Sequence, residues 1–330
     1  MNWGIQQLRQ VVIISVIGIV TALLLTILTP WRCDDLPSYS NPAADYPAAL
    51  LRIQQWQNSA VPSMNPLCQL TLMTHHHATE RGIVLVHGYT SCPRQFYSLG
   101  QQFYHAGYNV LIAPLPYHGD ANRFTHAHGQ LTAEALTQYA DRALDIAHGL
   151  GRRITMMGLS AGGVVTAWAA HHRSDIEQAI MIAPAFSFKP IPLPLTTAAM
   201  NLFSILPDSF VAWQPTNRID DTPNYAYPEY SYHALAQILR LSCMIKQAAQ
   251  HTAPATRRLV FVLNPNDQSV NNDAARELAA RWRNQYQVNL TIIDLPDQLK
   301  LAHDFISSER PHQFPELVYP RLLDAAGVHY

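Results

Sequence analysis

Short apolar runs alternate with amphipathic segments over most of the chain. The run 259–263 has the length and the Val, Leu and Phe content of a buried strand, whereas 132–148 repeats its apolar residues at helical spacing. We expect strands at 69–73, 83–86, 108–111, 153–157, 178–183, 259–263 and 288–293, and helices at 48–57, 93–105, 132–148, 160–171, 233–249, 273–285 and 315–325. This alternation predicts an α/β fold, with a mostly parallel sheet covered by helices on both faces.

One region interrupts the alternation. After the expected strand 178–183 the chain takes about 70 residues to reach Leu259, far more than an ordinary connection in an α/β unit. We therefore predict an inserted cap at 186–256. Its first half is apolar and rich in proline, and its second half contains the expected helix 233–249. Such a cap can exclude water and bind acyl chains, although most of its apolar residues would pack it onto the main domain.

The N-terminal segment is the most apolar part of the chain. Residues 11–29 form 19 consecutive positions without a charge, and as a helix they would span roughly 28 Å, about the hydrocarbon thickness of a bilayer. They predict a single transmembrane anchor. A cleaved signal peptide is the competing interpretation, but its apolar core is shorter and a small-residue cleavage site would follow directly. Arg9 slightly favours a cytoplasmic N-terminus, which would place the rest of the chain outside the cytoplasmic membrane.

These segments divide the chain into four parts. We expect a membrane anchor at 1–35, a linker at 36–65, an α/β core at 66–185 and 257–330, and the cap at 186–256. The chain has 330 residues, of which 48% are hydrophobic, enough for a single core after the anchor. A net charge of −1 offers no basic field for a nucleic acid, and no zinc-ligand spacing appears. We interpret 75–77, a run of three histidines, as a hairpin turn and not as a metal site.

The chain contains four cysteines, too few for a disulfide scaffold. Free, buried cysteines are therefore the default interpretation. In an extracytoplasmic domain, pairing among Cys33, Cys68 and Cys92 becomes possible. Cys68 and Cys92 flank the expected strand 83–86. We hypothesise a Cys68–Cys92 bridge that would brace the loop following that strand.

The sequence Gly158-Leu159-Ser160-Ala161-Gly162 stands between the expected strand 153–157 and the expected helix 160–171. A serine on such a sharp strand-to-helix turn has its hydroxyl exposed to substrate. Glycines are needed at both ends because a Cβ there would clash with the neighbouring strand or helix. The alternative is a glycine-rich turn without a catalytic role. We predict that Ser160 is a nucleophile.

A serine nucleophile needs a base and an acid that orients the base. Asp267 follows the expected strand 259–263, in the crevice where open α/β sheets bind ligands. It could instead only shape the turn of its loop, and Asp294 is the alternative acid. His303 lies on the loop after the last expected strand, where the base belongs if the other two assignments are correct.

Backbone amides should stabilise the oxyanion that such a serine creates. We expect one from Ala161, directly after the nucleophile, and one from Tyr89, on the loop after the apolar strand 83–86. Gly88 allows that loop to turn sharply. His87 precedes the turn, and we interpret it as a residue that holds the loop and not as the general base.

Five segments together resemble the α/β-hydrolase superfamily, and more narrowly its carboxylesterase and monoacylglycerol-lipase branch. They are Val86-His87-Gly88-Tyr89-Thr90, Pro114-Leu115-Pro116-Tyr117-His118-Gly119, the Ser160 motif, Asn266-Asp267-Gln268-Ser269-Val270 and Ala302-His303-Asp304. The resemblance runs from about residue 68 to the C-terminus and implies Ser160, Asp267 and His303 as catalytic residues. The chain departs from it at Ser91, where relatives often have glycine, and at Pro116-Tyr117, where many have Arg-Gly.

Together these observations predict a membrane-anchored serine hydrolase of carboxylic esters with an apolar acyl group, acting through an acyl-enzyme. It would need no metal or organic cofactor, and its partners would be an ester or lipid substrate and the membrane. An acyltransferase or a thioesterase on the same scaffold is an alternative, as is a catalytically silent relative that binds an apolar ligand. Serine in place of a carboxylate at the turn excludes dehalogenase chemistry. The oligomeric state is left open.

Overall fold

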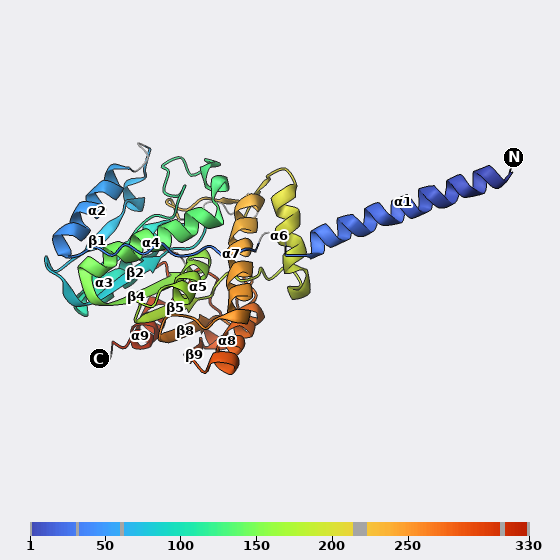
Figure 1. Cartoon of the computed structure of the whole chain (residues 1–330). Helices are drawn as coiled ribbons and strands as arrows, with labels where there is room; N and C mark the ends of the chain where they lie inside the picture. The colour runs from blue at the N-terminus through green and yellow to red at the C-terminus, as the bar shows by residue number, and fades with distance from the viewer. Residues whose placement is uncertain (1, 31–32, 60–62, 214–222, 311–313, 329–330) are drawn as a thin grey trace.

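The computed structural model describes the chain except for residues 1, 31–32, 60–62, 214–222, 311–313 and 329–330 (Figure 1). In the first helix the side chains of 2–5, 8, 11 and 19 are also outside the described residues. Parts of the predicted anchor, linker and cap therefore lie outside the described residues.

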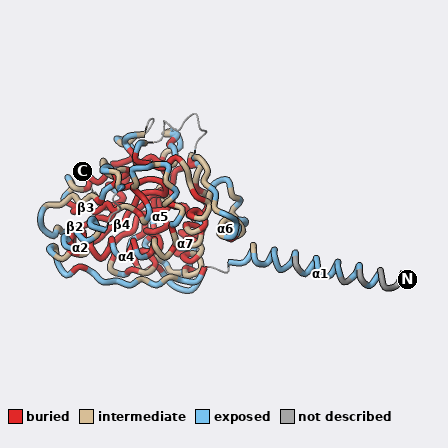
Figure 2. The backbone as a smooth tube through the Cα atoms, turned by 90° about the horizontal axis from the view of Figure 1, so that it is seen from above, coloured by how far each residue is buried: buried red, intermediate tan, exposed pale blue. Residues whose placement is uncertain are grey.

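A seven-stranded sheet with the order β1-β3-β2-β4-β5-β8-β9 forms the centre of the molecule. The strands are β1 (Thr71–Met73), β2 (Thr79–Val86), β3 (Tyr108–Ile112), β4 (Gly151–Leu159), β5 (Gln178–Ile182), β8 (Arg258–Leu263) and β9 (Asn289–Asp294). All neighbours are parallel except β1, which runs antiparallel to β3 at the edge. Every residue of β3 and β5 is buried, as expected for parallel strands covered on both faces (Figure 2).

The helices lie close to the positions that hydrophobic periodicity predicts. They include α2 (Tyr46–Asn58), α3 (Tyr97–His105), α4 (Ala133–Leu150), α5 (Ala161–His172), α7 (Tyr232–His251), α8 (Asn272–Tyr286) and α9 (Pro315–Ala325). The expected helix 93–105 is divided, because its first four residues form the 3₁₀ turn η2 (Pro93–Phe96). Polar side chains fix several starts: Thr132 accepts a hydrogen bond from the amide of Ala135, and Ser231 accepts one from Ala234.

The predicted hairpin at 75–77 is wrong. β1 and β2 do not pair with each other, because β3 lies between them and pairs with both. Buried Asn109 on β3 holds the connecting segment: its Oδ1 accepts from the amide of His75 at 2.8 Å, and its Nδ2 donates to the carbonyl of His77. A side chain on a third strand thus replaces the local turn that the sequence suggests.

The long segment between β5 and β8 contains its own secondary structure. The 3₁₀ turn η4 (Leu193–Leu195) leads into α6 (Thr196–Ile205), and a two-stranded sheet of β6 (Phe210–Ala212) and β7 (Glu229–Ser231) precedes α7. The described part of this cap packs α6 against α7, and α7 in turn against α5. The apolar side of α7 is therefore buried between the cap and the main domain.

All four cysteines are paired, so the default interpretation of free cysteines is wrong. The hypothesised Cys68–Cys92 bridge is present, and Cys33 pairs with Cys243 on α7. The second pairing joins residues 210 positions apart. A disulfide needs Cα atoms within about 7 Å, and nothing local in the sequence indicates that these two segments meet.

The segment 33–45 lies against the main domain. The carbonyl of Leu36 accepts a hydrogen bond from Trp168 Nε1 at 2.9 Å, and the carboxylate of Asp35 pairs with the imidazole of His172, also at 2.9 Å. The amide of Asn41 donates to Asp145. The disulfide of Cys33 holds the same segment at its beginning.

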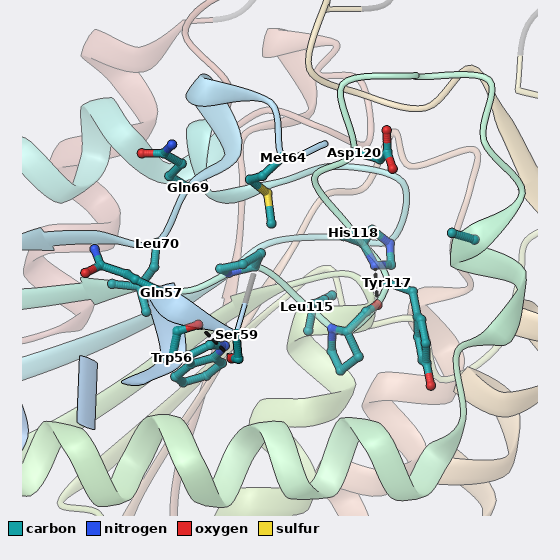
Figure 3. Close-up of a pocket in the computed structure, with 13 residues that line it drawn as sticks. Trp56, Gln57, Ser59, Met64, Gln69, Leu70, Leu115, Tyr117, His118 and Asp120 are labelled. Atoms are coloured by element: carbon teal, nitrogen blue, oxygen red, sulfur yellow. Dashed lines mark hydrogen bonds between the residues drawn. The ribbon is translucent and has the colours of Figure 1, made fainter. Parts of the chain in front are cut away.

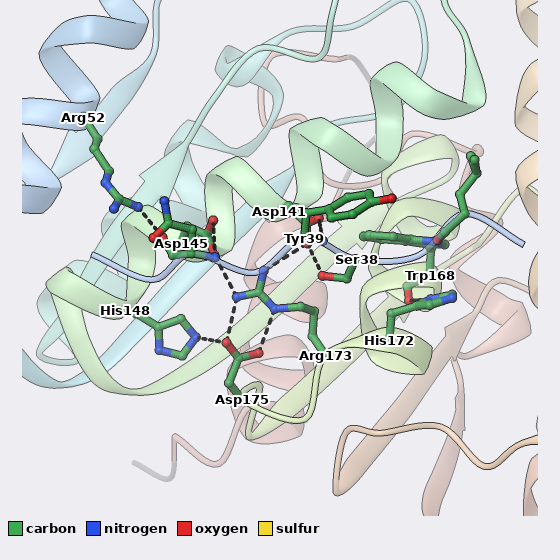
Figure 4. Close-up of polar contacts among 12 residues, drawn as sticks. Ser38, Tyr39, Arg52, Asp141, Asp145, His148, Trp168, His172, Arg173 and Asp175 are labelled. Atoms are coloured by element: carbon green, nitrogen blue, oxygen red, sulfur yellow. Dashed lines mark hydrogen bonds and ion pairs between the residues drawn. The ribbon is translucent and has the colours of Figure 1, made fainter. Parts of the chain in front are cut away.

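A buried arginine organises the surface to which this segment is bound (Figure 4). Arg173 is 2% exposed and forms ion pairs with Asp141, Asp145 and Asp175, at 3.0, 2.9 and 2.7 Å. Asp141 also accepts from Ser38 Oγ and from the amide of Tyr39. The two aspartates of α4 thus connect the guanidinium to the N-terminal segment.

Helix α1 (Asn2–Leu28) extends away from the domain (Figure 1). Its described apolar side chains are mostly exposed. At its end, buried Asn201 on α6 donates hydrogen bonds to the carbonyls of Thr26, Ile27 and Thr29. Within the described part of the chain, no helix reaches the length and hydropathy that crossing a membrane requires, so the transmembrane part of the predicted fold is not confirmed.

We predict that Arg173→Gln lowers the free energy of unfolding by about 3–5 kcal/mol, because it leaves the buried carboxylates of Asp141 and Asp145 without their cation. Urea denaturation of the full chain measures this. Arg153→Gln is the matched control, since its pair with Glu177 is about half exposed and should contribute at most about 1 kcal/mol. Equal, small losses in the two variants would contradict a structural role for Arg173.

Candidate active site

The sequence-predicted site residues lie at one edge of the sheet. Tyr89 follows β2, Ser160 follows β4, Asp267 follows β8 and His303 lies beyond β9. These strands are parallel, so their carboxyl ends meet at the same edge. This is the edge where open α/β sheets bind ligands.

Ser160 occupies a backbone conformation that few residues other than glycine adopt, with φ 59° and ψ −115°. The turn is fixed on both sides: the amide of Ser160 donates to the carbonyl of Ile182 at 2.9 Å, and its carbonyl accepts from Ala185. A Cβ on Gly158 would collide with the carbonyl of Gly162, and a Cβ on Gly162 with that of Val86. The predicted need for both glycines is thus explained by two close backbone approaches.

His303 and Asp267 form a hydrogen-bonded pair, with 2.7 Å between Nδ1 and Oδ2. Burial raises the pKa of Asp267, but the neighbouring imidazole and the amides of Ser269 and Val270 outweigh it and hold that pKa below its ordinary value. An ionised Asp267 accepts from Nδ1–H, which leaves Nε2 of His303 as the basic atom. The other oxygen atom of Asp267 accepts from the same two amides, so the residue also shapes its turn.

The alternative acid, Asp294, is paired with Arg276 instead. The loop of Asp267 is hydrogen-bonded to residues 187–189, which come after β5. The amide of Asn271 donates to the carbonyl of Ser187, and the amide of Lys189 donates to the carbonyl of Ser269. Among the described residues, Ser160 Oγ forms no hydrogen bond with His303. In enzymes without bound substrate such a contact is often long and shortens only in the complex.

The loop after β2 leaves one of its amides available. Gly88 donates its N–H to Gln95 Oε1 at 2.8 Å, Thr90 to His118 Nε2 at 3.2 Å, and Ser91 to the carbonyl of Gly88 at 3.2 Å. Within the described residues, neither the amide of Tyr89 nor that of Ala161 donates to another protein group. A Cβ on Gly88 would lie 3.5 Å from Ser160 Cβ, so this loop is next to the serine.

The cap holds this loop from the other side. The amide of Tyr227 donates to the carbonyl of Thr90 at 2.8 Å, and Trp213 Nε1 donates to Thr90 Oγ1 at 2.9 Å. Thr90 needs this support because its φ is +64°. No motif in the sequence marks Gln95, Trp213 or Tyr227 for this role. Trp213 and Tyr227 lie more than 100 positions from Thr90, and Gln95 is a glutamine in an otherwise ordinary turn.

Buried histidines support the same loop. His87 donates from Nδ1 to the carbonyl of Gly88 and accepts from the amide of Leu115 at Nε2, the structural role that the sequence suggested. Burial lowers the pKa of His87 to about 3 and that of His118 to about 4. His128, whose Nδ1 accepts from the hydroxyl of Tyr89, has a pKa lowered to about 3, mainly by burial. All three are neutral near pH 7 and serve as acceptors.

Among the described residues, no three His, Cys, Asp or Glu side chains gather in an arrangement that could hold a metal ion. The polar groups of the site are instead one hydroxyl, one imidazole–carboxylate pair and backbone amides. This combination suits nucleophilic attack on a carbonyl group, because it provides a nucleophile, a base and donors for an oxyanion.

The sequence of this chain is similar to those of known hydrolases. The model of the alpha/beta hydrolase family matches residues 83–314. The thermostable monoacylglycerol lipase of Bacillus sp. (strain H-257) is 25% identical over 242 residues, which are 68% of this chain and 90% of that protein.

Two solved structures of similar fold are monoacylglycerol lipases. That of Paleococcus ferrophilus has a TM-score of 0.59 and 17% identity, covering 79% of this chain and 98% of the other. A soluble variant of the Saccharomyces cerevisiae enzyme, in complex with a substrate analog, has a TM-score of 0.62 and 12% identity, covering 79% and 91%.

We predict that the free energy of unfolding falls as the pH decreases from 6.5 to 4. The pKa values of His87, His118 and His128 are lowered in the folded state, so below pH 6.5 the unfolded chain binds more protons and gains stability relative to the native one. Denaturant titrations between pH 7.5 and 4 measure the slope. His118→Gln should reduce this slope by up to the equivalent of about one bound proton. His105→Gln, which changes an exposed histidine, should leave the slope unchanged. A slope that His118→Gln leaves unchanged would refute this assignment.

Proposed function

This chain belongs to the alpha/beta hydrolase family, and from that premise we propose that it is a carboxylic ester hydrolase that acts through an acyl-enzyme on Ser160. The observation that carries the proposal is the serine on its strained turn, at the same sheet edge as the His303–Asp267 pair. The similarity to a monoacylglycerol lipase supports an ester as the substrate.

In this proposal Ser160 Oγ attacks the ester carbonyl while Nε2 of His303 takes its proton. Asp267 keeps the imidazole oriented and stabilises its charged form. The amides of Tyr89 and Ala161 donate to the oxyanion of the tetrahedral intermediate. The intermediate then collapses to the acyl-enzyme: the bond between the carbonyl carbon and the alkoxy oxygen breaks, and the imidazolium gives its proton to the leaving oxygen, which departs as the alcohol.

A water molecule next attacks the acyl-enzyme, and His303 again accepts the proton. Collapse of the second tetrahedral intermediate releases the carboxylic acid and returns the proton to Ser160. The cap adjoins this site through Trp213 and Tyr227, and its segment 186–212 is rich in apolar residues. An ester with an apolar acyl group, of the kind that monoacylglycerol lipases cleave, is the substrate class we propose.

We further propose that helix α1 attaches the enzyme to a membrane. Its exposed apolar side chains include Val12, Ile13, Ile14, Val16, Ile17, Val20, Leu23, Leu24, Leu25 and Leu28. Exposed Leu202, Ile205 and Leu206 of α6 and its end extend this surface onto the cap, where Asn201 binds the end of α1. Apolar surface of this extent is unfavourable in water and favours contact with lipid.

The two disulfides support a location outside the cytoplasm. Disulfides persist in oxidising compartments and are rare where thiols are kept reduced. Both pairs join segments that position functional parts of the molecule: Cys68–Cys92 lies beside the loop of Tyr89, and Cys33–Cys243 connects the N-terminal segment to the cap. We therefore propose that the catalytic domain is extracytoplasmic.

The ester hydrolase is tested with p-nitrophenyl esters of increasing acyl length. We predict turnover by the full chain and a loss of at least about 10⁴-fold in Ser160→Ala and in Asp267→Asn. Ser174→Ala is the control, because it removes an exposed hydroxyl just before β5, at the sheet edge opposite to that of Ser160. A folded protein without turnover at any acyl length would reject the proposal, and faster cleavage of the matching thioesters would redirect it to thioesterase activity.

Membrane attachment is tested by flotation with phospholipid vesicles. We predict that the full chain floats with the vesicles, whereas a chain lacking residues 1–28 and retaining Cys33 remains in the dense fractions. Replacing Val16, Val20 and Leu24 by lysine should have the same effect, because charges oppose insertion into hydrocarbon. Flotation of the truncated chain would show that attachment does not depend on α1.

A further inference from the structure

A cavity of about 520 Å³ lies between the end of α2, residues 64–70 and the loop that follows β3 (Figure 3). Ser160, Asp267, His303 and Tyr89 are absent from the described residues that line it. It is therefore distinct from the candidate active site, although the loop after β3 borders both.

Six of the thirteen described residues that line this cavity lie outside the match to the family model, which begins at residue 83. Trp56, Met64 and Leu70 come from that N-terminal part, and Leu115 and Tyr117 come from the loop after β3. Trp56 is fixed by edge-to-face contact with Tyr139 of α4, with 5.7 Å between ring centres. The residues before the matched region thus contribute much of this concave surface.

The lining has an apolar floor and a polar rim. Leu70 and Leu115 are buried, and Met64 and Trp56 project beside them (Figure 3). The amide side chains of Gln57 and Gln69 lie at the edge of the cavity. Such a distribution fits a molecule with an alkyl chain and a head group that can form hydrogen bonds.

The charged side chains in the lining limit which ligands the cavity can bind. The described lining includes one carboxylate, Asp120, and no Lys or Arg. Asp120 already accepts hydrogen bonds from Ser63 Oγ at 2.7 Å and from the amide of Asn122 at 2.8 Å. A fatty-acid carboxylate would meet no cation among these described lining residues, and the nearby guanidinium of Arg142 is placed over the ring of Trp56, so a neutral head group is favoured.

The cavity is physically joined to the oxyanion loop and the cap. His118 in its wall accepts from the amide of Thr90, and the amide of Asp120 donates to the hydroxyl of Tyr227 at 2.9 Å. Tyr227 in turn donates its amide to Thr90. A molecule bound against the loop after β3 would contact residues that hold the loop of Tyr89.

We propose that this cavity is a second binding site, separate from the catalytic serine, for one neutral single-chain amphiphile with a hydroxylated head group. The alkyl chain lies on the Leu70–Leu115 floor, and the head group meets the glutamines of the rim. The proposal does not depend on ester hydrolysis, because binding alone defines it.

The test uses full-length Ser160→Ala protein in phosphatidylcholine nanodiscs and a 1-O-alkylglycerol with a photoreactive diazirine in its chain. The ether cannot be hydrolysed, and the serine variant removes turnover. We expect the probe to label peptides from 56–70 and 114–127. Excess 1-O-hexylglycerol should prevent this labelling, whereas hexanoate, which has a similar chain and a negative charge, should not.

Ala127 lines the cavity, and Ala121 is exposed on the same loop outside the lining. Ala127→Phe fills part of the space and should weaken labelling about tenfold, whereas Ala121→Phe should not change it. Labelling that is insensitive to Ala127→Phe, or confined to peptides containing Ser160 or His303, would overturn the second site. Equal competition by hexanoate would overturn the preference for a neutral ligand even if the filled variant failed to fold.

Discussion

The constraint on which the rest of the site depends is the strained turn at Ser160. A non-glycine residue at φ 59° and ψ −115° costs on the order of 1–3 kcal/mol, so the surrounding structure must hold it there. The close approaches at Gly158 and Gly162 provide that support, because the turn fits only where two Cβ atoms are absent. β4 lies inside the sheet between β2 and β5, which fixes the turn from both sides. Rigidity at this one residue directs the hydroxyl out of the sheet.

The loop beside the serine is held by a different kind of interaction. Most of its polar backbone groups are bound by side chains or by the cap, and two of the acceptors, Gln95 and His118, are buried and uncharged. Burial that keeps His118 neutral also keeps its Nε2 able to accept from Thr90. The amide of Tyr89 is available, whereas the amides of Gly88, Thr90 and Ser91 beside it already have acceptors. Preorganised donors of this kind stabilise developing charge without rearrangement.

Hydrophobic periodicity predicted most elements because the sheet is parallel and buried. The same property explains why Ser160, Asp267 and His303 could be placed together: each follows a strand, and parallel strands end at one edge. The failures share a cause, since each involves partners distant in sequence. Asn109 replaced the expected hairpin turn, and Cys243 paired with Cys33 across 210 positions. Local patterns carry no information on such pairs.

The bonds made by the N-terminal segment limit how far α1 and the domain can move relative to each other. This segment is bonded to the cap through Cys243 and Asn201, and to the main domain through Trp168 and the aspartates around Arg173. A chain held at four places cannot act as a swivel between α1 and the domain. If α1 is attached to a membrane, the domain has one preferred orientation, with α6 of the cap next to α1 (Figure 1). In that case the ion pairs of Arg173, which hold the N-terminal segment on the main domain, would help to fix this orientation.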